Sequence, residues 1–538
     1  MLQTSKMMIA LLLSAVTLSI SVAAPMLKNK SNIRHKQHTI YISGHYSKDL
    51  KQPGRVTIRL WKDLFSIGKS DYTPHRSFSA AVKNGSFSIE IDSVDEVSYI
   101  SLSDNKDKWG TSLDFLSFYL VQPGDNVRMD ISKRFVAKPS KVLNESGDST
   151  CLNCINIKFS GKGANKYNCR FKIDEAKDEA MKTYMSNAAG KEYERIKYFE
   201  NKGLKIPRQT IAEESQRDLK TANYIEGKSL DVLQTYKPQL SGDVYEMLKA
   251  SLIGQVLDQF YARPMYSFLH LPGLEKYKKW YKKFHYNNKY GISDQIARKA
   301  VYFADFLIDR SWLESSLYGT EVTGFDFQTD RVEATYHLIK SKYQGQLKDK
   351  LLLTFLMDKP GSSPLMEDGL NTIKTNEYLE ILDSIKTNSQ VGAKAYDFSL
   401  PDSTGKNVTL GSFKGKVVFI DFWFTGCKGC SQYYTEQVSK VEEDYEHNPN
   451  VVFISVSIDA VRSNWIKSVY SFRYTSPTVI NLYKASSSPI IKQFFVNSFP
   501  HPLLIDKNGL IFSNSSAELR EKGITGLENK INQALALK

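Results

Sequence analysis

The sequence predicts a multidomain protein with an antiparallel β-sandwich near the N-terminus, an α-helical middle region and an α/β domain at the C-terminus. Apolar and polar residues alternate in short runs over 37–135, apolar residues recur at helical spacing over 164–389, and apolar strands alternate with helical segments over 391–538. With 538 residues, 41% of them hydrophobic, the chain is long enough for about three domains of ordinary size.

Composition and charge exclude several classes of protein. The chain contains 17 Pro and 30 Gly without a fixed period, which excludes collagen-like and low-complexity architectures. The net charge is +14, but the 72 basic residues are interspersed with 58 acidic ones and form no long basic run. We therefore expect no nucleic acid among the partners of this protein.

The first 23 residues have the pattern of a cleavable secretory signal peptide. Lys6 precedes an apolar run from Met7 to Val22, and small residues end the run. We expect cleavage after Ala23, with an uncleaved anchor helix as the alternative. The mature protein is then expected in the periplasm, or otherwise secreted to the cell envelope, where disulfides form and persist.

Residues 37–135 are predicted to form the β-sandwich, because turn sequences separate the alternating runs. These runs cover 40–42, 56–60, 87–91 and 127–131. Asn84-Gly85 is a good two-residue hairpin turn, since both residues tolerate a positive φ. No cluster of His with carboxylates suggests a metal in this region, so we expect a binding or packing module.

A Cys-containing linker is expected over 136–163, before the helical region of 164–389. Cys151 and Cys154 form a C-x-x-C pair, and Cys169 follows shortly after. We expect a structural disulfide between two of these three residues. The alternatives are a zinc site, for which a fourth ligand is missing, and a second redox centre. The helical region indicates a bundle that could serve spacing, self-association or partner docking.

The segment 391–538 carries the chemistry. Lys416 to Trp423 is a nearly continuous apolar run, typical of a strand buried on both faces, and a short turn, a second C-x-x-C pair and a helical pattern follow it. This order puts Cys427 at a helix N-terminus, where unpaired backbone N–H groups favour a thiolate, and Cys430 one turn further along. The pair is predicted to open and close a disulfide, with Cys427 attacking and Cys430 resolving.

Three stretches of this segment together resemble a known family. Residues 421–423 with the C-x-x-C pair, and residues 499–509, look like the thioredoxin fold of the TlpA-like thiol-disulfide oxidoreductases. Residues 395–402 are similar to the lead-in that this group shares with the AhpC/TSA proteins. The resemblance covers about 391–538 and implies a thioredoxin-like fold there. The regions before it are similar to those of multidomain, envelope-located members.

The resemblance also implies roles for individual residues. Cys427 matches the exposed nucleophile of the family, and Cys430 matches the resolving thiol. Asp421 matches a buried acid with a raised pKa that takes the proton from the resolving Cys, with an ordinary strand-end carboxylate as the alternative. Trp423 matches a Trp that packs beside the dithiol, and Pro500 matches a cis-proline whose backbone pairs with a substrate strand.

The sequence departs from the family pattern around the dithiol. Phe499, which precedes Pro500 in the expected substrate-binding rim, is bulkier than usual, and Gly426 replaces an aromatic residue. Lys428, between the two cysteines, should stabilise a thiolate on the nucleophile, which favours the reduced form and makes the couple a stronger oxidant. His501, next to Pro500, is expected at the surface.

These patterns predict a secreted thiol-disulfide oxidoreductase that exchanges its dithiol with protein thiols and disulfides. We expect no bound cofactor and no metal, and the resemblance implies another dithiol protein, such as a membrane thiol-transfer protein, as redox partner. One alternative is a peroxiredoxin-like peroxidase, although Ile420 and Phe424 stand where that class has Pro and Thr relative to Cys427. The other is a non-catalytic envelope binding or scaffold protein with a structural disulfide.

Overall fold

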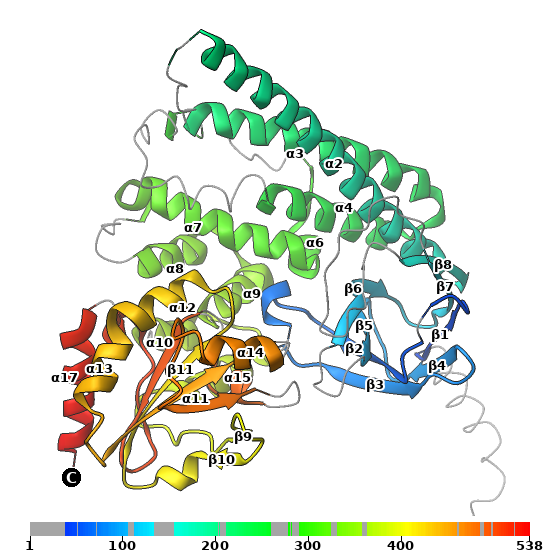
Figure 1. Ribbon diagram of the computed structural model, residues 1–538. Helices are drawn as coiled ribbons and strands as arrows, with labels where there is room; N and C mark the ends of the chain where they lie inside the picture. Colours follow the sequence, from blue (N-terminus) through cyan, green and yellow to red (C-terminus); the bar gives the residue numbers. More distant parts are fainter. Residues whose placement is uncertain are drawn as a thin grey trace, which may run out of the picture.

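The computed structural model describes residues 38–50, 52–70, 73–105, 112–133, 155–202, 204, 211–259, 278–279, 281, 290–323, 331–357, 363–459, 462–484, 489–496, 499–520 and 522–537. The predicted signal peptide at 1–23 lies outside these residues, as do Cys151 and Cys154. β-Strands, then helices, then an α/β domain follow one another along the chain (Figure 1). Within the described residues, no helix has a stretch long and apolar enough to cross a lipid bilayer.

The N-terminal region contains two four-stranded sheets, ordered β4-β1-β7-β8 and β3-β2-β5-β6. The strands are β1 (Ile40–Tyr46), β2 (Arg55–Trp61), β3 (Arg76–Ala81), β4 (Ser86–Ile91), β5 (Ser98–Asn105), β6 (Ser112–Val121), β7 (Asn126–Lys133) and β8 (Ile155–Lys162). Alternate residues of both sheets, among them Ile42 and Ile58, belong to one hydrophobic cluster. The two sheets therefore bury their apolar faces in a common core.

Strand pairing differs from the predicted antiparallel arrangement in one place. β1 pairs in parallel with β7, with Ile42 opposite Val127, while the other strand pairs in the two sheets are antiparallel. The prediction of an all-antiparallel region was wrong for this pair. Hydrophobic alternation reports which side chains are buried, but it does not reveal which distant strand lies alongside or in which direction.

Two local predictions in this region have mixed outcomes. Asn84 and Gly85 have φ angles of 50° and 76°, and Lys83 pairs with Ser86, as expected of a two-residue turn. The turn nevertheless leads from β3 to β4, which belong to different sheets. The predicted linker at 136–163 contains β8, which pairs with β7 along its whole length, so the sheet region continues beyond the expected boundary.

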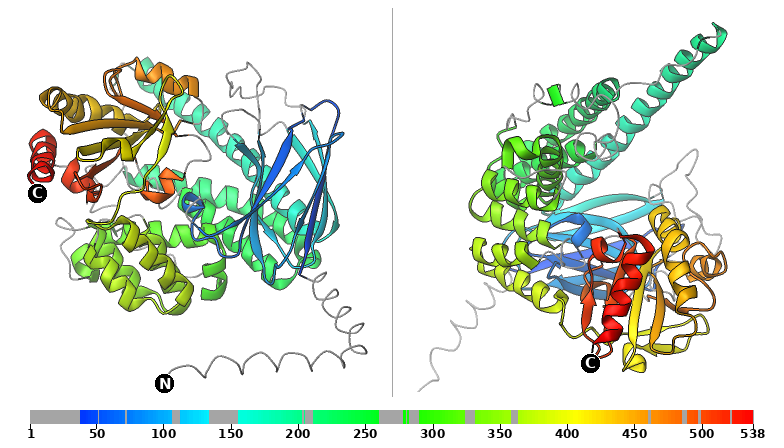
Figure 2. Two further views of the ribbon diagram at one scale, coloured as in Figure 1. Left: turned by 90° about the horizontal axis from the view of Figure 1, so that it is seen from below. Right: turned by 90° about the vertical axis from the view of Figure 1, so that its left-hand side faces the viewer.

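The middle region is helical, as predicted. Its α-helices are α2 (Ala164–Asn201), α3 (Ile211–Tyr236), α4 (Gly242–Leu257), α6 (Asp294–Lys299), α7 (Val301–Thr323), α8 (Arg331–Lys342), α9 (Gly345–Leu356), α10 (Ser363–Thr372) and α11 (Asn376–Ser389). α2 packs against α3, and its far end extends beyond the rest of the molecule (Figure 2). Cys169 lies buried in α2 and is free within the described residues, and burial raises the pKa of its thiol to about 12.

The C-terminal domain has a central five-stranded sheet ordered β13-β12-β11-β14-β15, and β9 and β10 form a separate small ladder. Its strands are β9 (Ser399–Pro401), β10 (Asn407–Thr409), β11 (Val417–Trp423), β12 (Val451–Ser457), β13 (Ile480–Tyr483), β14 (His501–Ile505) and β15 (Ile511–Ser513). Its α-helices are α12 (Lys428–Tyr433), α13 (Ser439–Asp444), α14 (Arg462–Val469), α15 (Ile490–Gln493), α16 (Ser516–Leu519) and α17 (Gly523–Ala536). β11 is parallel to β12 and antiparallel to β14.

This domain has the thioredoxin-like fold that the resemblance implies. Residues of α13 and α17 pack on one face of the sheet, and residues of α15 pack on the other. The helical pattern after Cys430 corresponds to two helices, because a π-helical turn at Tyr434–Val438 separates α12 from α13. Such π-turns occur frequently at functional sites.

Candidate active site

Strand β11 is the central strand of the five-stranded sheet and leads to the candidate site. All of its residues are buried, and they alternate between the two faces. Val417 and Phe419 pack in the cluster that contains Tyr433, whereas Val418 and Ile420 pack on the opposite face. The strand ends at Trp423, and the dithiol follows after a short turn.

Cys427 and Cys430 are joined by a disulfide at the start of α12, with their Cα atoms 5.3 Å apart. Cys427 is the N-cap residue of the helix, and its Sγ accepts a hydrogen bond from the backbone N–H of Cys430 at 3.1 Å. Cys427 is 7% exposed and Cys430 is 1% exposed, so Cys427 is the more accessible of the two. The hydrogen bond to its sulfur favours a thiolate there.

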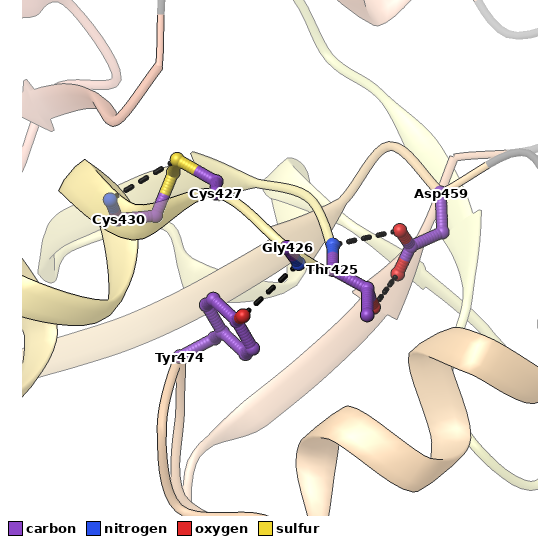
Figure 3. The surroundings of a disulfide bond; sticks show 6 residues. All are labelled: Thr425, Gly426, Cys427, Cys430, Asp459 and Tyr474. Carbon is purple, nitrogen blue, oxygen red and sulfur yellow. Dashed lines mark hydrogen bonds between the residues drawn. A yellow bond between two sulfur atoms is a disulfide. The ribbon is translucent and has the colours of Figure 1, made fainter. Parts of the chain in front are cut away.

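Two side chains from outside the helix hold the turn before Cys427 (Figure 3). Asp459, which follows β12, accepts hydrogen bonds from the backbone N–H and the Oγ1 hydroxyl of Thr425, both at 2.8 Å. The backbone N–H of Gly426 donates to the hydroxyl oxygen of Tyr474 at 3.0 Å. Gly426 has a φ of +94°, which a residue with a side chain rarely adopts, so the turn requires glycine at this position.

Trp423 lies beside the dithiol, as predicted. It belongs to one hydrophobic cluster with Cys427 and Cys430. Its indole Nε1 donates to Ser455 Oγ at 2.6 Å, and its ring stacks on that of Tyr474 with centroids 4.9 Å apart and an angle of 2° between the planes. These two contacts hold the indole in place beside the disulfide.

Asp421 is buried on the strand that leads to the dithiol, two residues before Trp423 and on the same face of the sheet. Neither of its carboxylate oxygens has a hydrogen-bond partner among the described residues. Burial raises the pKa of Asp421 to about 8, with a smaller contribution from Glu442, while the charge of Arg520 opposes the shift. The carboxyl group is therefore largely protonated at neutral pH.

Phe499 and Pro500 line the other side of the dithiol. The peptide bond between them is cis, as the resemblance implies. A Cβ atom at Gly429, between the two cysteines, would lie 3.6 Å from Pro500 Cδ, so the C-x-x-C loop and the proline are in close contact. Phe424 is 37% exposed and meets the ring of Phe499 edge to face at 5.4 Å, which gives this rim an aromatic surface.

His501 was expected at the surface, and that expectation was wrong. The residue is 5% exposed because it begins β14, where it lies opposite Phe422 in the centre of the sheet. Its Nε2 atom has no hydrogen-bond partner in the described structure, and burial lowers its pKa to about 4. A neutral, buried imidazole here packs against the ring of Phe422.

The remaining predicted residue, Lys428, is exposed at the first position of α12. Two contributors, Asp459 and Tyr474, were not predicted from the sequence. Asp459 stands two residues after the end of β12, a common place for functional carboxylates in α/β folds, and this signal could have identified it. No local pattern marks Tyr474. Across the described residues, no group of three or more His, Cys, Asp or Glu side chains could hold a metal ion.

Comparisons with known proteins agree on this domain. Residues 390–526 match the family model described as Redoxin. A thiol-disulfide oxidoreductase ResA from Geobacillus thermodenitrificans is 31% identical over 142 residues, which are 26% of this chain and 74% of that protein. A ResA from Bacillus cereus is 30% identical over 152 residues, 27% of this chain and 81% of that protein.

Two solved structures are also similar to part of this chain. A putative thiol-disulfide oxidoreductase from Bacteroides vulgatus is 24% identical with a TM-score of 0.24, and covers 28% of this chain and 99% of that chain. A putative thiol:disulfide interchange protein DsbE from Chlorobium tepidum is 26% identical with a TM-score of 0.23, and covers 28% of this chain and 99% of that chain. The family assignment rests on the curated relatives, and the Redoxin match at 390–526 includes the dithiol. Through its C-terminal domain, this chain belongs to the TlpA-like thiol-disulfide oxidoreductases of the thioredoxin fold.

Proposed function

We propose that the Cys427–Cys430 pair exchanges disulfides with protein substrates outside the cytoplasm. The observation that carries this proposal is the disulfide at the start of α12, with the more accessible sulfur hydrogen-bonded to a backbone N–H. That hydrogen bond stabilises the thiolate, which is the form that attacks a disulfide.

In the reducing direction, the thiolate of Cys427 attacks one sulfur of a substrate disulfide. A mixed disulfide forms, and the substrate's first thiolate leaves and takes up a proton. The thiol of Cys430 then loses its proton and attacks Cys427 Sγ, so the second substrate thiolate leaves and the Cys427–Cys430 disulfide forms. Two electrons pass from the enzyme dithiol to the substrate, and the oxidising direction is the reverse of these steps.

Asp421 is proposed to accept the proton from Cys430. A base is needed because Cys430 is almost fully buried and its thiol must ionise before it attacks. Support for this role comes from the unpartnered carboxyl group and from its pKa of about 8, close to that of an ordinary thiol, so the minor ionised fraction present at neutral pH can accept the proton.

We propose that Phe499 and Pro500 form the substrate-binding rim, and that Trp423, which is fully buried, supports this rim from beneath. The backbone beside Pro500 would pair with an extended segment of the substrate, and the exposed ring of Phe424 adds apolar surface. Lys428 is proposed to tune the couple, because its exposed cation would stabilise the thiolate of Cys427 and so favour the reduced form.

The proposed setting is the cell envelope. A signal peptide at 1–23 would direct export, and the dithiol domain at 391–538 would be carried on a β-sandwich domain beginning near 37 and a helical region at 164–389. The redox partner would be another dithiol protein, such as a membrane thiol-transfer protein, since ResA relatives are themselves named thiol-disulfide oxidoreductases.

Trapping of a mixed disulfide tests the exchange chemistry. The reduced full-length Cys430→Ser variant is mixed with oxidised insulin as a model disulfide substrate, and adducts are mapped by mass spectrometry. We expect a stable adduct at Cys427, because the resolving thiol is absent, and no adduct there in the Cys427→Ser variant. Absence of the adduct in both variants would contradict the proposal and favour a structural disulfide.

A further inference from the structure

The turn of residues 424–426 places the nucleophilic sulfur, and none of its own side chains reaches far into the protein core. Phe424 is exposed at the rim, and Gly426 has no side chain. Thr425 is anchored through its hydroxyl and its backbone N–H, and Gly426 through its backbone N–H. The position of Cys427 therefore depends on what accepts these hydrogen bonds.

Asp459 is the acceptor on one side of the turn. It is 9% exposed, and besides the two bonds from Thr425 its Oδ2 accepts from Ser457 Oγ at 2.9 Å. Thr425 Oγ1 also lies 2.7 Å from Ser468 Oγ, in α14. The carboxylate and the Thr425 hydroxyl thus tie the end of β12 and helix α14 to the turn.

Tyr474 is the acceptor on the other side. Its ring is fixed by stacking on Trp423, and its hydroxyl oxygen accepts from Gly426 N–H. Two adjacent peptide N–H groups, those of Thr425 and Gly426, are therefore bound by side chains that come from different parts of the chain. This arrangement fixes both the place and the direction in which the chain enters α12.

We propose that Asp459 and Tyr474 are positioning residues that hold Cys427 where its sulfur meets the N–H of Cys430, an inference that rests on the proposed role of Cys427 as nucleophile. Without the anchors, the turn shifts and the hydrogen bond to the sulfur weakens. The thiolate then forms less readily and is presented less accurately to the substrate disulfide.

Two substitutions of Asp459 separate positioning from charge, because both remove the negative charge. An Asn side chain can accept from the N–H of Thr425 through its oxygen and donate its N–H groups to the hydroxyls of Thr425 and Ser457. An Ala side chain can do neither. Any difference between Asp459→Asn and Asp459→Ala therefore reports the hydrogen-bonded geometry alone.

The experiment measures two properties of each reduced full-length variant: the pH dependence of Cys427 alkylation, which needs no substrate, and the rate of insulin disulfide reduction. For Asp459→Ala we expect the pKa of the Cys427 thiol to lie about one unit above that of Asp459→Asn. We also expect a loss in rate of roughly tenfold to a hundredfold, most of it in kcat, whereas Asp459→Asn keeps most of the rate. Tyr474→Phe, which keeps the ring stack, should lose a smaller factor of about threefold to tenfold.

Asp506 provides a matched control. It is a buried aspartate of the same domain that accepts from the backbone N–H groups of Asn508 and Leu510, at the far end of β14 from the dithiol. Asp506→Ala should lower stability but leave the alkylation profile unchanged. Equal alkylation profiles for Asp459→Ala and Asp459→Asn would overturn the positioning role. Inactivity of the wild type towards insulin would instead count against the proposed function, and the alkylation comparison would still decide the positioning role.

Discussion

Two buried ionisable groups in different regions of this molecule have opposite surroundings. Lys350, in α9, is fully buried and has a partner for each of its N–H bonds. Asp421, in β11, is 4% exposed and has no hydrogen-bond partner for either oxygen in the described structure. The difference separates a charge that holds the fold together from a carboxyl group that is free to exchange a proton.

The first group joins the N-terminal sheets to the helical region. Lys350 Nζ donates to Asp63 Oδ1 at 2.7 Å, to the carbonyl of Leu64 at 2.8 Å and to the carbonyl of Arg298 at 2.7 Å. Asp63 also accepts from Arg298 Nη1 at 3.1 Å and from the hydroxyl of Tyr378. Burial alone would raise the pKa of Asp63, but the charge of Lys350 and these bonds outweigh it and lower the pKa.

A cavity of about 190 Å³ lies beside this network. The charged side chains that line it are paired with one another, including Lys62 with Glu96 and Glu377, and Lys299 with Glu96. Each charged group among the described lining residues thus has an ion-pair partner. The unpartnered Asp421, by contrast, is destabilising when ionised, and such a group persists where chemistry needs it.

The largest expected effect is a loss of stability when the hydrogen-bond network around Lys350 is broken. Asp63→Ala leaves Lys350 buried without its counter-charge and should lower the free energy of unfolding by about 3–5 kcal/mol. Asp92→Ala, which breaks the exposed pair with Arg76, is the control and should cost less than about 1 kcal/mol. Urea unfolding followed by circular dichroism measures both. Similar losses in the two variants would remove the distinction between this network and a surface pair.

The next largest effect is on the rate at which Cys430 attacks the mixed disulfide when Asp421 is replaced. Asp421→Asn removes the proposed proton acceptor, so the attack of Cys430 on the mixed disulfide should slow by about a hundredfold at pH 7. Stopped-flow measurement of the decay of the mixed disulfide isolates this step. An unchanged rate would mean that Asp421 is an ordinary strand-end carboxylate.

Asp421 should also make stability depend on pH. Its pKa rises from 3.8 in the unfolded chain to about 8 in the fold, so the folded state holds the proton more tightly. This contribution to stability is complete below pH 3.8 and is lost as the pH rises towards 8, by roughly 1.4 kcal/mol for each unit. Unfolding of the wild type and of Asp421→Asn should therefore diverge over this range, with the variant relatively more stable at high pH. Parallel pH profiles would contradict the raised pKa.

The smallest effect concerns Lys428. Replacing it with Met removes an exposed cation beside Cys427, so the thiolate is less stabilised and the reduction potential of the couple should fall by about 10–30 mV. Lys440→Met, at an exposed position of α13, is the control and should change the potential less. A rise in potential, or an equal shift in the control, would contradict the tuning role.

The sequence was most informative where the signals are local. The apolar run to Trp423 and the spacing of Cys427 and Cys430 were sufficient to predict a buried strand, a turn and a helix with the dithiol at its N-terminus. The parallel pairing of β1 with β7 and the place of β8 in the same sheet depend on distant contacts, which alternation of residues does not report.

The same reason explains the errors and omissions at the site. His501 was expected at the surface, but its pairing with Phe422 buries it. Tyr474 lies far from the dithiol in the sequence, and its ring is held near the dithiol by stacking on the ring of Trp423. The unpartnered state of Asp421 is a property of the surrounding core, so the sequence alone left an ordinary carboxylate open.

The most direct test of this account is a redox titration of the Cys427–Cys430 couple in the full-length protein. The protein is equilibrated with dithiothreitol or glutathione buffers, free thiols are trapped, and the peptide that contains both cysteines is analysed by mass spectrometry. We predict reversible two-electron reduction at a potential between about −270 mV, typical of a reductant such as thioredoxin, and about −120 mV, typical of a strong oxidant. A pair that stays oxidised across that whole range would be a structural disulfide, and the proposed exchange function would be wrong.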